Sequence, residues 1–138
     1  MGMDEQQDFH DHLGMQRTEW REGYVEIVLD VKPRHLNRGG IVHGGVLLSL
    51  LDEAGGAAGN WCSVKGNRRW AVTVDLNCHF VGRSSEGRVT VIGEVVSAGR
   101  TLYFAKSEAR DSSGRLLAFG SSTHRWRRGS EKVEGLPL

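Results

Sequence analysis

Residues 42–62 read VHGGVLLSLLDEAGGAAGNWC and form the one long helical pattern of the chain. Apolar side chains fall on nearly every side of such a helix, so we expect it to be buried rather than half exposed. His43, Asp52 and Glu53 interrupt the apolar run, and these polar groups argue against a membrane-spanning helix. The stretch therefore predicts one central helix inside a globular domain.

On both sides of this helix the sequence alternates apolar and polar side chains, as strands do. One such run precedes the helix and four follow it, with short turns between them: 24–31, then 70–80, 87–98, 101–111 and 115–126. This order predicts a two-layer α+β fold, in which an antiparallel sheet of about five to six strands wraps around the helix. A small sheet leaves an edge to be paired or covered, and edge pairing between two copies is one natural remedy.

The length of 138 residues suits a single domain. We expect an N-terminal helical extension over residues 1–20, the main domain over 21–128 and a flexible polar tail over 129–138. Within the extension, a short helix is predicted over residues 4–13, with Asp4 near its start and Gly14 just past its end.

The N-terminus and the cysteines indicate the compartment. MGMDEQQDFHDHLG has neither a basic region nor an apolar stretch, so no signal peptide is expected. Cys62 and Cys78 form no CxxC pattern and are explained as reduced, buried thiols. We therefore expect a cytoplasmic protein.

Charge and composition exclude several classes of partner. The chain is 38% hydrophobic and 25% charged, which is ordinary for a globular protein. Its formal net charge is +1, so no strong field directs it to nucleic acid or to a membrane surface. The six histidines have no zinc-like spacing, so we expect neither a metal nor a cofactor.

One face of the predicted helix is small and polar. Spacings of four, three, four and three residues place the following side chains on it: Gly45, Ser49, Asp52, Gly56 and Gly59. Each interior glycine costs about 1 kcal/mol relative to alanine, so something approaches the backbone closely, either another element of the fold or a ligand. An aspartate on a buried helix is costly unless it is paired or functional, which makes Asp52 a candidate site residue.

The segment NRGGIVHGG, residues 37–45, leads into the helix. Glycines at a helix start leave backbone N–H groups free, with the positive end of the helix dipole behind them. Such a start can stabilise an anion or a developing oxyanion. The GKS or GKT ending of a phosphate-binding P-loop is missing, so a nucleotide site is not indicated.

The run N-x-x-G-x-x-H-G-G-x-x-x-S-L-x-D, from Asn37 to Asp52, resembles the hotdog-fold thioesterases of the phenylacetate-degradation (PaaI-like) type. The segments VTVDLNCHF (72–80), GRSSEG (82–87) and GRTLYFAKSEARDSSGRLLAFGSSTHRW (99–126) are similar to that family's remaining strands and turn, so the resemblance covers roughly residues 20–127. It implies the hotdog fold and hydrolysis of an aryl- or medium-chain acyl-CoA. It also implies a homodimer or a dimer of dimers.

The resemblance implies a role for each motif residue. Gly44 would offer its N–H to the thioester carbonyl, and Asp52 would act as general base or nucleophile. The supporting positions are Asn37, which would orient thioester or water, and Thr73, whose hydroxyl would position water. His43 would be structural or substrate-positioning, and Gly45 and Ser49 would face the substrate. Ser49 is also explained as a small helix-packing residue, because no histidine is placed to activate it.

Geometry adds that the site is shared between two chains. Eight residues separate Gly44 from Asp52, which is about 12 Å along a helix. A thioester carbon must lie within about 3–3.5 Å of the attacking atom and close to the oxyanion donor. Two antiparallel helices across a dyad bring the two ends together and form two equivalent sites.

Other interpretations stay open at this point. A non-catalytic acyl-CoA sensor on the same fold competes with the enzyme, although Asp52 is present and few residues precede the first strand. A hydratase would need a different arrangement of histidine and aspartate. Three arginines at turns or strand ends either meet coenzyme A phosphates or are ordinary surface residues: Arg83, Arg100 and Arg125. Strand alternation places Asp75 and Asn77 on the same face as Thr73, either near the site or in solvent.

Overall fold

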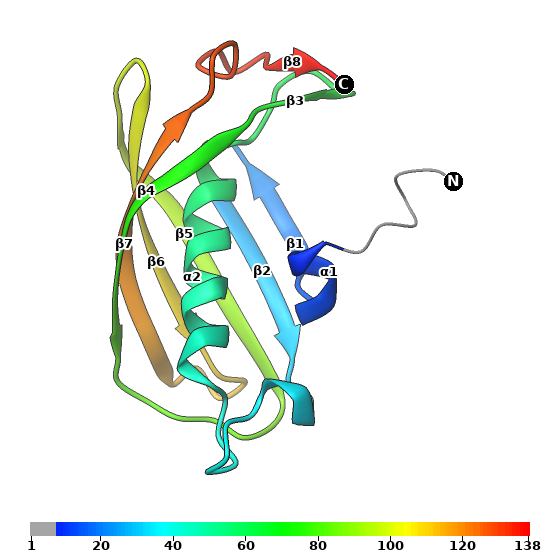
Figure 1. Ribbon diagram of the computed structural model, residues 1–138, viewed down its shortest axis with the longest axis vertical. Helices are drawn as coiled ribbons and strands as arrows, with labels where there is room; N and C mark the ends of the chain where they lie inside the picture. The colour runs from blue at the N-terminus through cyan, green and yellow to red at the C-terminus, as the bar shows by residue number, and fades with distance from the viewer. Residues whose placement is uncertain (1–7) are drawn as a thin grey trace.

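One long helix, α2 (Gly44–Gly59), lies against a six-stranded antiparallel sheet (Figure 1). The computed structural model describes residues 8–138. The strand order is β1-β2-β5-β6-β7-β4, with bounds β1 Gln16–Arg21, β2 Tyr24–Asp30, β4 Ala71–Phe80, β5 Arg88–Ala98, β6 Leu102–Arg110 and β7 Leu116–Trp126. The predicted two-layer fold, a sheet wrapped around one helix, is confirmed.

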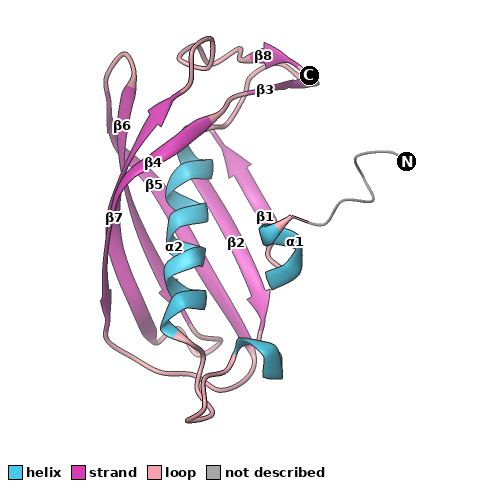
Figure 2. Ribbon diagram, in the orientation of Figure 1, coloured by secondary structure: helices cyan, strands magenta, loops and turns pink. Residues whose placement is uncertain are grey.

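The predicted elements agree with the structure wherever hydrophobic periodicity is strong. Strands β2, β4, β5, β6 and β7 match the five predicted strands to within one residue at each end. Helix α2 is shorter than the predicted 42–62, because His43 caps its start and Asn60 its end. Two short strands, β3 (Asn67–Arg68) and β8 (Leu136–Pro137), form a separate ribbon beyond the C-terminal end of α2 (Figure 2).

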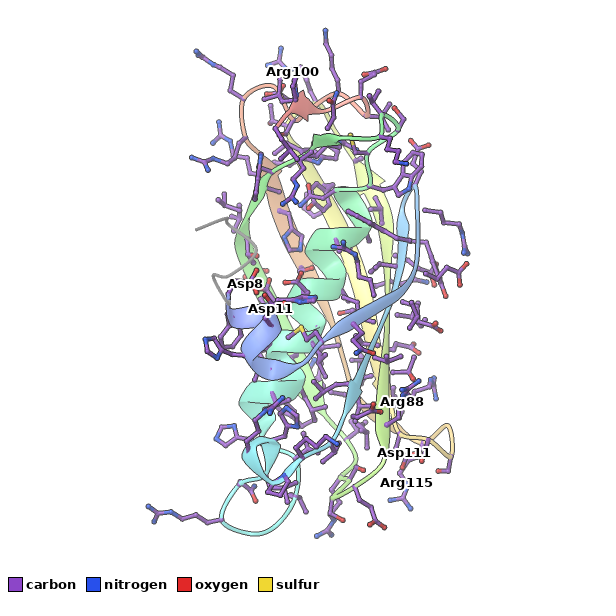
Figure 3. All side chains as sticks on the ribbon, turned by 90° about the vertical axis from the view of Figure 1, so that its right-hand side faces the viewer. Asp8, Asp11, Arg88, Arg100, Asp111 and Arg115 are labelled. Atoms are coloured by element: carbon purple, nitrogen blue, oxygen red, sulfur yellow. The ribbon has the colours of Figure 1, made fainter. Side chains whose placement is uncertain are left out.

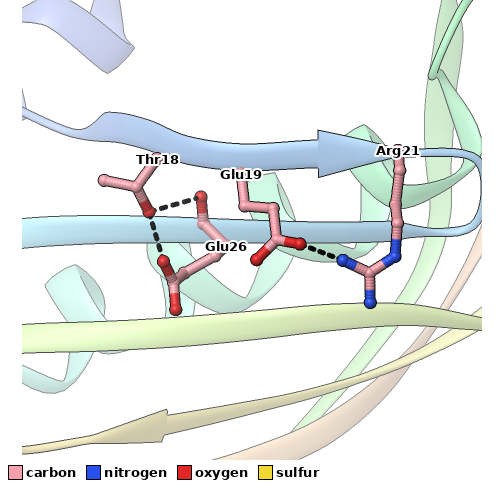
Figure 4. Close-up of polar contacts among 4 residues, drawn as sticks. All are labelled: Thr18, Glu19, Arg21 and Glu26. Carbon is pink, nitrogen blue, oxygen red and sulfur yellow. Dashed lines mark hydrogen bonds and ion pairs between the residues drawn. The ribbon is translucent and has the colours of Figure 1, made fainter.

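Strand β1 was not predicted, and all of it but Arg21 lies inside the segment expected as an N-terminal extension. Half of its residues in the sequence QRTEWR are charged, and of its side chains only Trp20 is partly buried. Polar contacts line the outer face of the β1–β2 hairpin: Thr18 Oγ1 donates to Glu26 Oε2 at 2.6 Å, and Arg21 pairs with Glu19 (Figure 4). A charged edge strand carries no apolar alternation, which is why the pattern analysis missed it.

A short helix, α1 (Phe9–Leu13), precedes β1 and lies at that edge of the sheet (Figure 1). The Asp8 carboxylate caps its start by accepting from the Asp11 N–H, and Gly14 ends it with a φ of 83°. This confirms the end of the expected helix at Gly14, but the helix begins after Asp8; Asp4 and residues 5–7 lie outside the described residues. Figure 3 labels Asp8 and Asp11 at the start of α1.

The core fills the space between α2 and the inner face of the sheet. The helix contributes Val46, Leu47, Leu50, Leu51, Ala54, Ala57 and Ala58, and the strands contribute Val25, Ile27, Leu29, Val89, Val91, Ala109, Leu117 and Ala118. The opposite face of the helix is only partly buried and carries Ser49, Asp52 and Gly56. The small polar stripe, apart from the buried Gly59, is therefore the side of α2 that the core leaves open. Within residues 8–138, no helix is long and apolar enough to cross a membrane.

The C-terminal end of α2 is held by side chains from three strands. The last carbonyls of a helix have no partner within it and must be satisfied elsewhere. Here Trp20 Nε1 donates to the Ala57 carbonyl at 2.7 Å, Tyr103 Oη to Gly56 at 2.8 Å, and Trp126 Nε1 to Gly59 at 3.0 Å. These bonds fix the helix along its axis as well as against the sheet.

The C-terminal segment differs from the flexible tail expected over residues 129–138. Strand β8 pairs with β3, and Ser130 is fully buried with its Oγ accepting from the Trp70 N–H at 2.8 Å. The Arg69 guanidinium donates to the carbonyls of Ser130, Glu131 and Trp61. The segment is polar in sequence, yet these bonds satisfy its backbone and pin it to the domain.

Candidate active site

The half-exposed face of α2 brings Asp52 opposite strand β4. Thr73, on that strand, donates its hydroxyl to Asp52 Oδ1 at 2.7 Å. One carboxylate oxygen is thus held by the protein. The sequence placed these two residues in one site only through the family resemblance, and the structure brings them into direct contact.

A β-bulge decides which way Thr73 points. Thr73 pairs with His124 of β7, but Asp75 pairs with Thr123, so Val74 is an extra residue in β4. Neighbours on β7 face opposite sides of the sheet, and cross-strand partners share a side. Thr73 therefore faces α2 while Asp75 faces outward. The expectation that Asp75 and Asn77 share the face of Thr73 is wrong, because simple alternation does not hold across a bulge.

Behind Thr73 lies a pair of buried polar side chains that sequence reasoning missed. His124 Nδ1 is 3.3 Å from Thr73 Oγ1, and His124 Nε2 is 2.7 Å from Ser122 Oγ. Burial lowers the pKa of His124, while the nearby Asp52 carboxylate acts in the opposite direction. The alternation of Ser122, His124 and Trp126 along β7 indicates an inward-facing row, but nothing in the sequence says that β7 lies beside β4.

The glycines of α2 make room for this row. A Cβ added at Gly59 would lie 2.2 Å from the Tyr103 ring, and one added at Gly55 would lie 2.3 Å from Ser122 Oγ. At Gly56 the contact to His124 would be an ordinary 3.5 Å. Of the two interpretations of the small stripe, close packing against the sheet accounts for Gly59, and the same holds for Gly55 outside the stripe.

The N-terminal end of α2 presents one unused donor. His43 caps the helix, its Nδ1 accepting the Gly45 N–H at 2.7 Å, so Gly45 has no free N–H for a ligand. Among the hydrogen bonds of residues 8–138, none takes the Gly44 N–H. The ring of Phe80, at the end of β4, lies beside Gly44. Gly44 is thus the free amide at the positive end of the helix dipole.

Asn37 and Ser49 make local contacts. Asn37 Oδ1 accepts the N–H groups of Gly39 and Ile41 and so shapes the loop before α2. Ser49 donates its hydroxyl to the Gly45 carbonyl one turn earlier, at 2.7 Å. The structure explains both residues as parts of the scaffold, and their contact with a substrate stays a prediction.

A cavity of about 740 Å³ opens beside Asp52 and runs along the second half of α2. Its walls include Trp20, Trp61, Trp70, Gly56, Ala57 and Asn60, with Arg17, Lys65, Arg68 and Arg69 also present. Glu53 lines it too, and burial raises the pKa of its carboxyl, assisted by Asp52 and opposed by His10. Glu53 is thus only partly exposed, next to Asp52 on the helix.

The candidate metal ligands and the three candidate arginines are spread over several parts of the molecule. Within the described part of the chain, one cluster has metal-ligand spacing, namely Asp8, His10 and Asp11 on α1, and its Asp8 carboxylate already caps that helix. The three candidate arginines do not form one site. Arg83 follows β4 near the start of α2, whereas Arg100 lies in the turn after β5 at the opposite end (Figure 3). Arg125 lines a separate hollow of about 380 Å³ on the outer side.

Comparison with known proteins agrees with the fold described above. Residues 39–118, which include α2, Asp52 and Thr73, match the family described as the thioesterase superfamily. This chain belongs to the thioesterase superfamily. The superfamily assignment makes it a thioester hydrolase of the hotdog fold, as the sequence motif indicated.

Individual relatives agree with this assignment. A Mycobacterium tuberculosis protein described as a candidate esterase is 33% identical over 113 residues, covering 81% of this chain and 81% of the relative. The PaaI protein of the Escherichia coli phenylacetic acid degradation operon has the same fold, with a TM-score of 0.77 at 20% identity over 88% of this chain and 85% of PaaI. A hypothetical thioesterase of Streptococcus pneumoniae, solved with coenzyme A, has a TM-score of 0.73 at 22% identity, covering 91% and 89%.

Proposed function

We propose that this thioesterase hydrolyses an aryl- or medium-chain acyl-CoA to the free acid and coenzyme A, with Asp52 as the catalytic carboxylate. The observation that carries the proposal is the Thr73–Asp52 hydrogen bond at the mouth of the 740 Å³ cavity. One carboxylate oxygen is fixed by Thr73, and the other is left for water or for the thioester. The Streptococcus pneumoniae relative was solved with coenzyme A, which supports coenzyme A as the leaving group here.

The chemistry needs a base or nucleophile and an oxyanion donor. As general base, Asp52 takes a proton from water while the water oxygen bonds to the thioester carbon. The carbonyl oxygen becomes an oxyanion, which the free Gly44 N–H at the start of α2 stabilises. The carbon–sulfur bond then breaks, and the thiolate of coenzyme A leaves and takes up a proton. As nucleophile, Asp52 would instead form an anhydride that water hydrolyses.

The two catalytic groups come from different copies of the chain. Gly44 and Asp52 are about 12 Å apart along α2, beyond the reach of one thioester carbon. Strand β4 offers the edge for pairing. It is ten residues long, and Val72 and Val74 on it are more than half exposed, whereas the other edge, β1, is shorter and charged. Long apolar edges are templates for strand pairing, so β4 against β4 of a second copy fits a dyad-related dimer.

The lining of the cavity supports an aryl- or medium-chain acyl group as the substrate. It extends from Asp52 towards the C-terminal end of α2, where the indoles of Trp20, Trp61 and Trp70 form part of its walls. Indole faces stack favourably against aromatic rings and also pack against alkyl chains. A ring or a chain of medium length therefore fits this space, with the coenzyme A portion outside it.

The first test is turnover by an Asp52→Asn variant. The amide keeps the acceptor for Thr73 but has no basic oxygen, so kcat should fall by roughly 10²–10⁴, as for loss of a general base. Thiol release across short, medium, long and aromatic acyl-CoAs measures it and identifies the acyl group. Turnover near that of the wild type would remove Asp52 from the mechanism.

The second test mixes two inactive variants. Proline at Gly44 removes only the N–H, because this is the first helical position, where proline is well tolerated. The backbone of His43 before it, at φ −62° and ψ 136°, suits a residue preceding proline. Gly44→Ala is the matched control: it keeps the N–H, and its Cβ would meet Phe80 at an ordinary 3.4 Å.

Co-expression of Gly44→Pro with Asp52→Ala should restore about a quarter of wild-type activity. Half of the dimers are then mixed, and in each mixed dimer one site carries both lesions and the other carries none. The Gly44→Ala protein should keep most of its activity. No recovery on mixing, with both variants folded, would show that each site lies within one chain.

A further inference from the structure

Four polar side chains form an unbroken line that begins in the sheet and ends at the proposed catalytic carboxylate. Ser122 Oγ lies 2.7 Å from His124 Nε2, His124 Nδ1 lies 3.3 Å from Thr73 Oγ1, and Thr73 Oγ1 lies 2.7 Å from Asp52 Oδ1. The line crosses from β7 to β4 and then to α2. Thr73 and His124 are direct cross-strand partners, so their proximity is built into the register of the sheet.

Counting protons along the line fixes the direction of every bond. An ionised carboxylate only accepts hydrogen bonds, so the Thr73 hydroxyl donates its one proton to Asp52. Thr73 Oγ1 can then only accept from His124, which requires the proton of the neutral ring on Nδ1. Nε2 is therefore an acceptor, and Ser122 is its donor. The opposite tautomer would draw the Thr73 proton towards the histidine and away from Asp52.

The surroundings are arranged for this histidine. Only 2% of its surface is exposed, and it stacks on Tyr103 with a centroid distance of 5.0 Å. Gly55 of α2 leaves the space that Ser122 and His124 occupy, because a Cβ there would lie 2.3 Å from Ser122 Oγ and 3.0 Å from Nε2. An interior glycine costs about 1 kcal/mol of helix stability relative to alanine, so the space is made at a cost.

The ring is also kept neutral, as the proton count requires. Burial lowers the pKa of His124, and the nearby Asp52 carboxylate acts in the opposite direction. Thr73, Ser122 and Tyr103 lie against the ring, and the residue also lines the cavity beside Asp52.

We propose that His124 is a positioning residue for hydrolysis: its Nδ1–H, fixed by Ser122, turns the Thr73 hydroxyl onto Asp52 and so aims the carboxylate. The inference rests on the proposed function, in which Asp52 attacks or activates water. His124 lines the cavity beside Asp52, but in this scheme it acts on the reaction through Thr73. Hydrogen bonds in a chain polarise one another, so the donor at the far end strengthens the bond at Asp52.

A matched pair of amide variants separates the two ends of the ring. In His124→Asn the side-chain amide occupies the place of Nδ1 and can still donate to Thr73. In His124→Gln it occupies the place of Nε2 and meets Ser122 instead. We expect His124→Gln to lower kcat about 10- to 100-fold at unchanged KM, the effect of one misdirected hydrogen bond to a charged group. His124→Asn should stay within about threefold of the wild type.

Equal losses in the two variants, or a loss confined to KM, would overturn the proposal, because packing alone would then account for His124. Circular dichroism and thermal denaturation of each variant serve as the folding controls. If a variant fails to fold, Ser122→Ala takes its place. Losing the Ser122 donor should lower kcat and raise the share of ring protonated at Nε2.

The tautomer of the wild-type protein provides a readout that needs no activity. Nitrogen-15 shifts of the His124 ring distinguish a proton on Nδ1 from one on Nε2, and we expect Nδ1. A ring protonated at Nε2 would refute the proposal even in a fully active enzyme. Conversely, the Nδ1 tautomer in a protein without thioesterase activity would uphold the hydrogen-bond chain while the proposed function fails.

Discussion

Replacing Gly59 by alanine tests how closely α2 packs on the sheet. An added Cβ would lie 2.2 Å from Tyr103 Cε2, about 1.2 Å short of a 3.4 Å van der Waals contact. Tyr103 has little room to withdraw, since it is fully buried, stacks on His124 and Trp126, and donates its hydroxyl to the Gly56 carbonyl. The substitution therefore forces a fixed ring out of place.

The expected cost follows from three effects. Overpacking a core costs about 1–3 kcal/mol. Losing the bond from Tyr103 to Gly56 leaves buried groups unsatisfied and costs about 1–3 kcal/mol more. Alanine favours the helix more than glycine does, which offsets about 1 kcal/mol of this loss. The net loss is about 3 kcal/mol, which at a urea m-value of about 2 kcal/mol/M lowers the unfolding midpoint by about 1.5 M.

Urea denaturation at one fixed protein concentration measures the effect, since a dimer gains stability with concentration. Gly56→Ala is the matched control on the same helix. Its Cβ would meet His124 at 3.5 Å, so that variant should be neutral or up to about 1 kcal/mol more stable. If Gly59→Ala unfolded at the midpoint of the wild type, or if both variants shifted alike, the steric argument would be refuted.

Three further predictions concern single side chains. Burial raises the pKa of Glu53 in the folded protein, so the wild type loses stability as the pH rises from the unfolded pKa of about 4.3 through the folded pKa. Glu53→Gln should therefore be more stable than the wild type at neutral pH and equally stable in acid, which a pH series of thermal melts checks. Thr73→Val keeps the shape of the side chain but removes the donor to Asp52, so kcat should fall by a larger factor than KM changes. Thr73→Ser should retain most activity in the thiol-release assay. Ser130→Ala leaves the Trp70 N–H without its acceptor and should cost about 1–3 kcal/mol in a denaturation experiment; no change would mean that the C-terminal segment is not part of the cooperative fold.

How far the sequence predicted the fold follows from the kind of pattern each element carries. Helix α2 and five strands have strong apolar periodicity, and their bounds are close to those expected. Strand β1 is charged and lies at an edge, so it has no such signature. The segment after Gly129 is polar, and its order depends on Arg69 and on pairing with β3, neither of which is a local property.

The site was predictable only in part. The family resemblance predicted Asp52, Thr73 and Gly44 as site residues, and the structure accounts for the contact between the first two. The bulge at Val74 could not be foreseen, because it depends on the pairing of β4 with β7. The contacts of His124 could not be predicted for the same reason, because its partners, Thr73 and Ser122, become neighbours only when the sheet forms.

The aromatic donors at the end of α2 have a consequence for spectroscopy. The indoles of Trp20 and Trp126 each donate to a carbonyl of the last helical turn, from strands that lie far apart in the sheet order. Their emission therefore depends on whether the helix is seated, and a protein with Trp61 and Trp70 replaced by phenylalanine would carry this signal alone. In such a protein, stopped-flow fluorescence would time the docking of the helix separately from the formation of the sheet, without an added label.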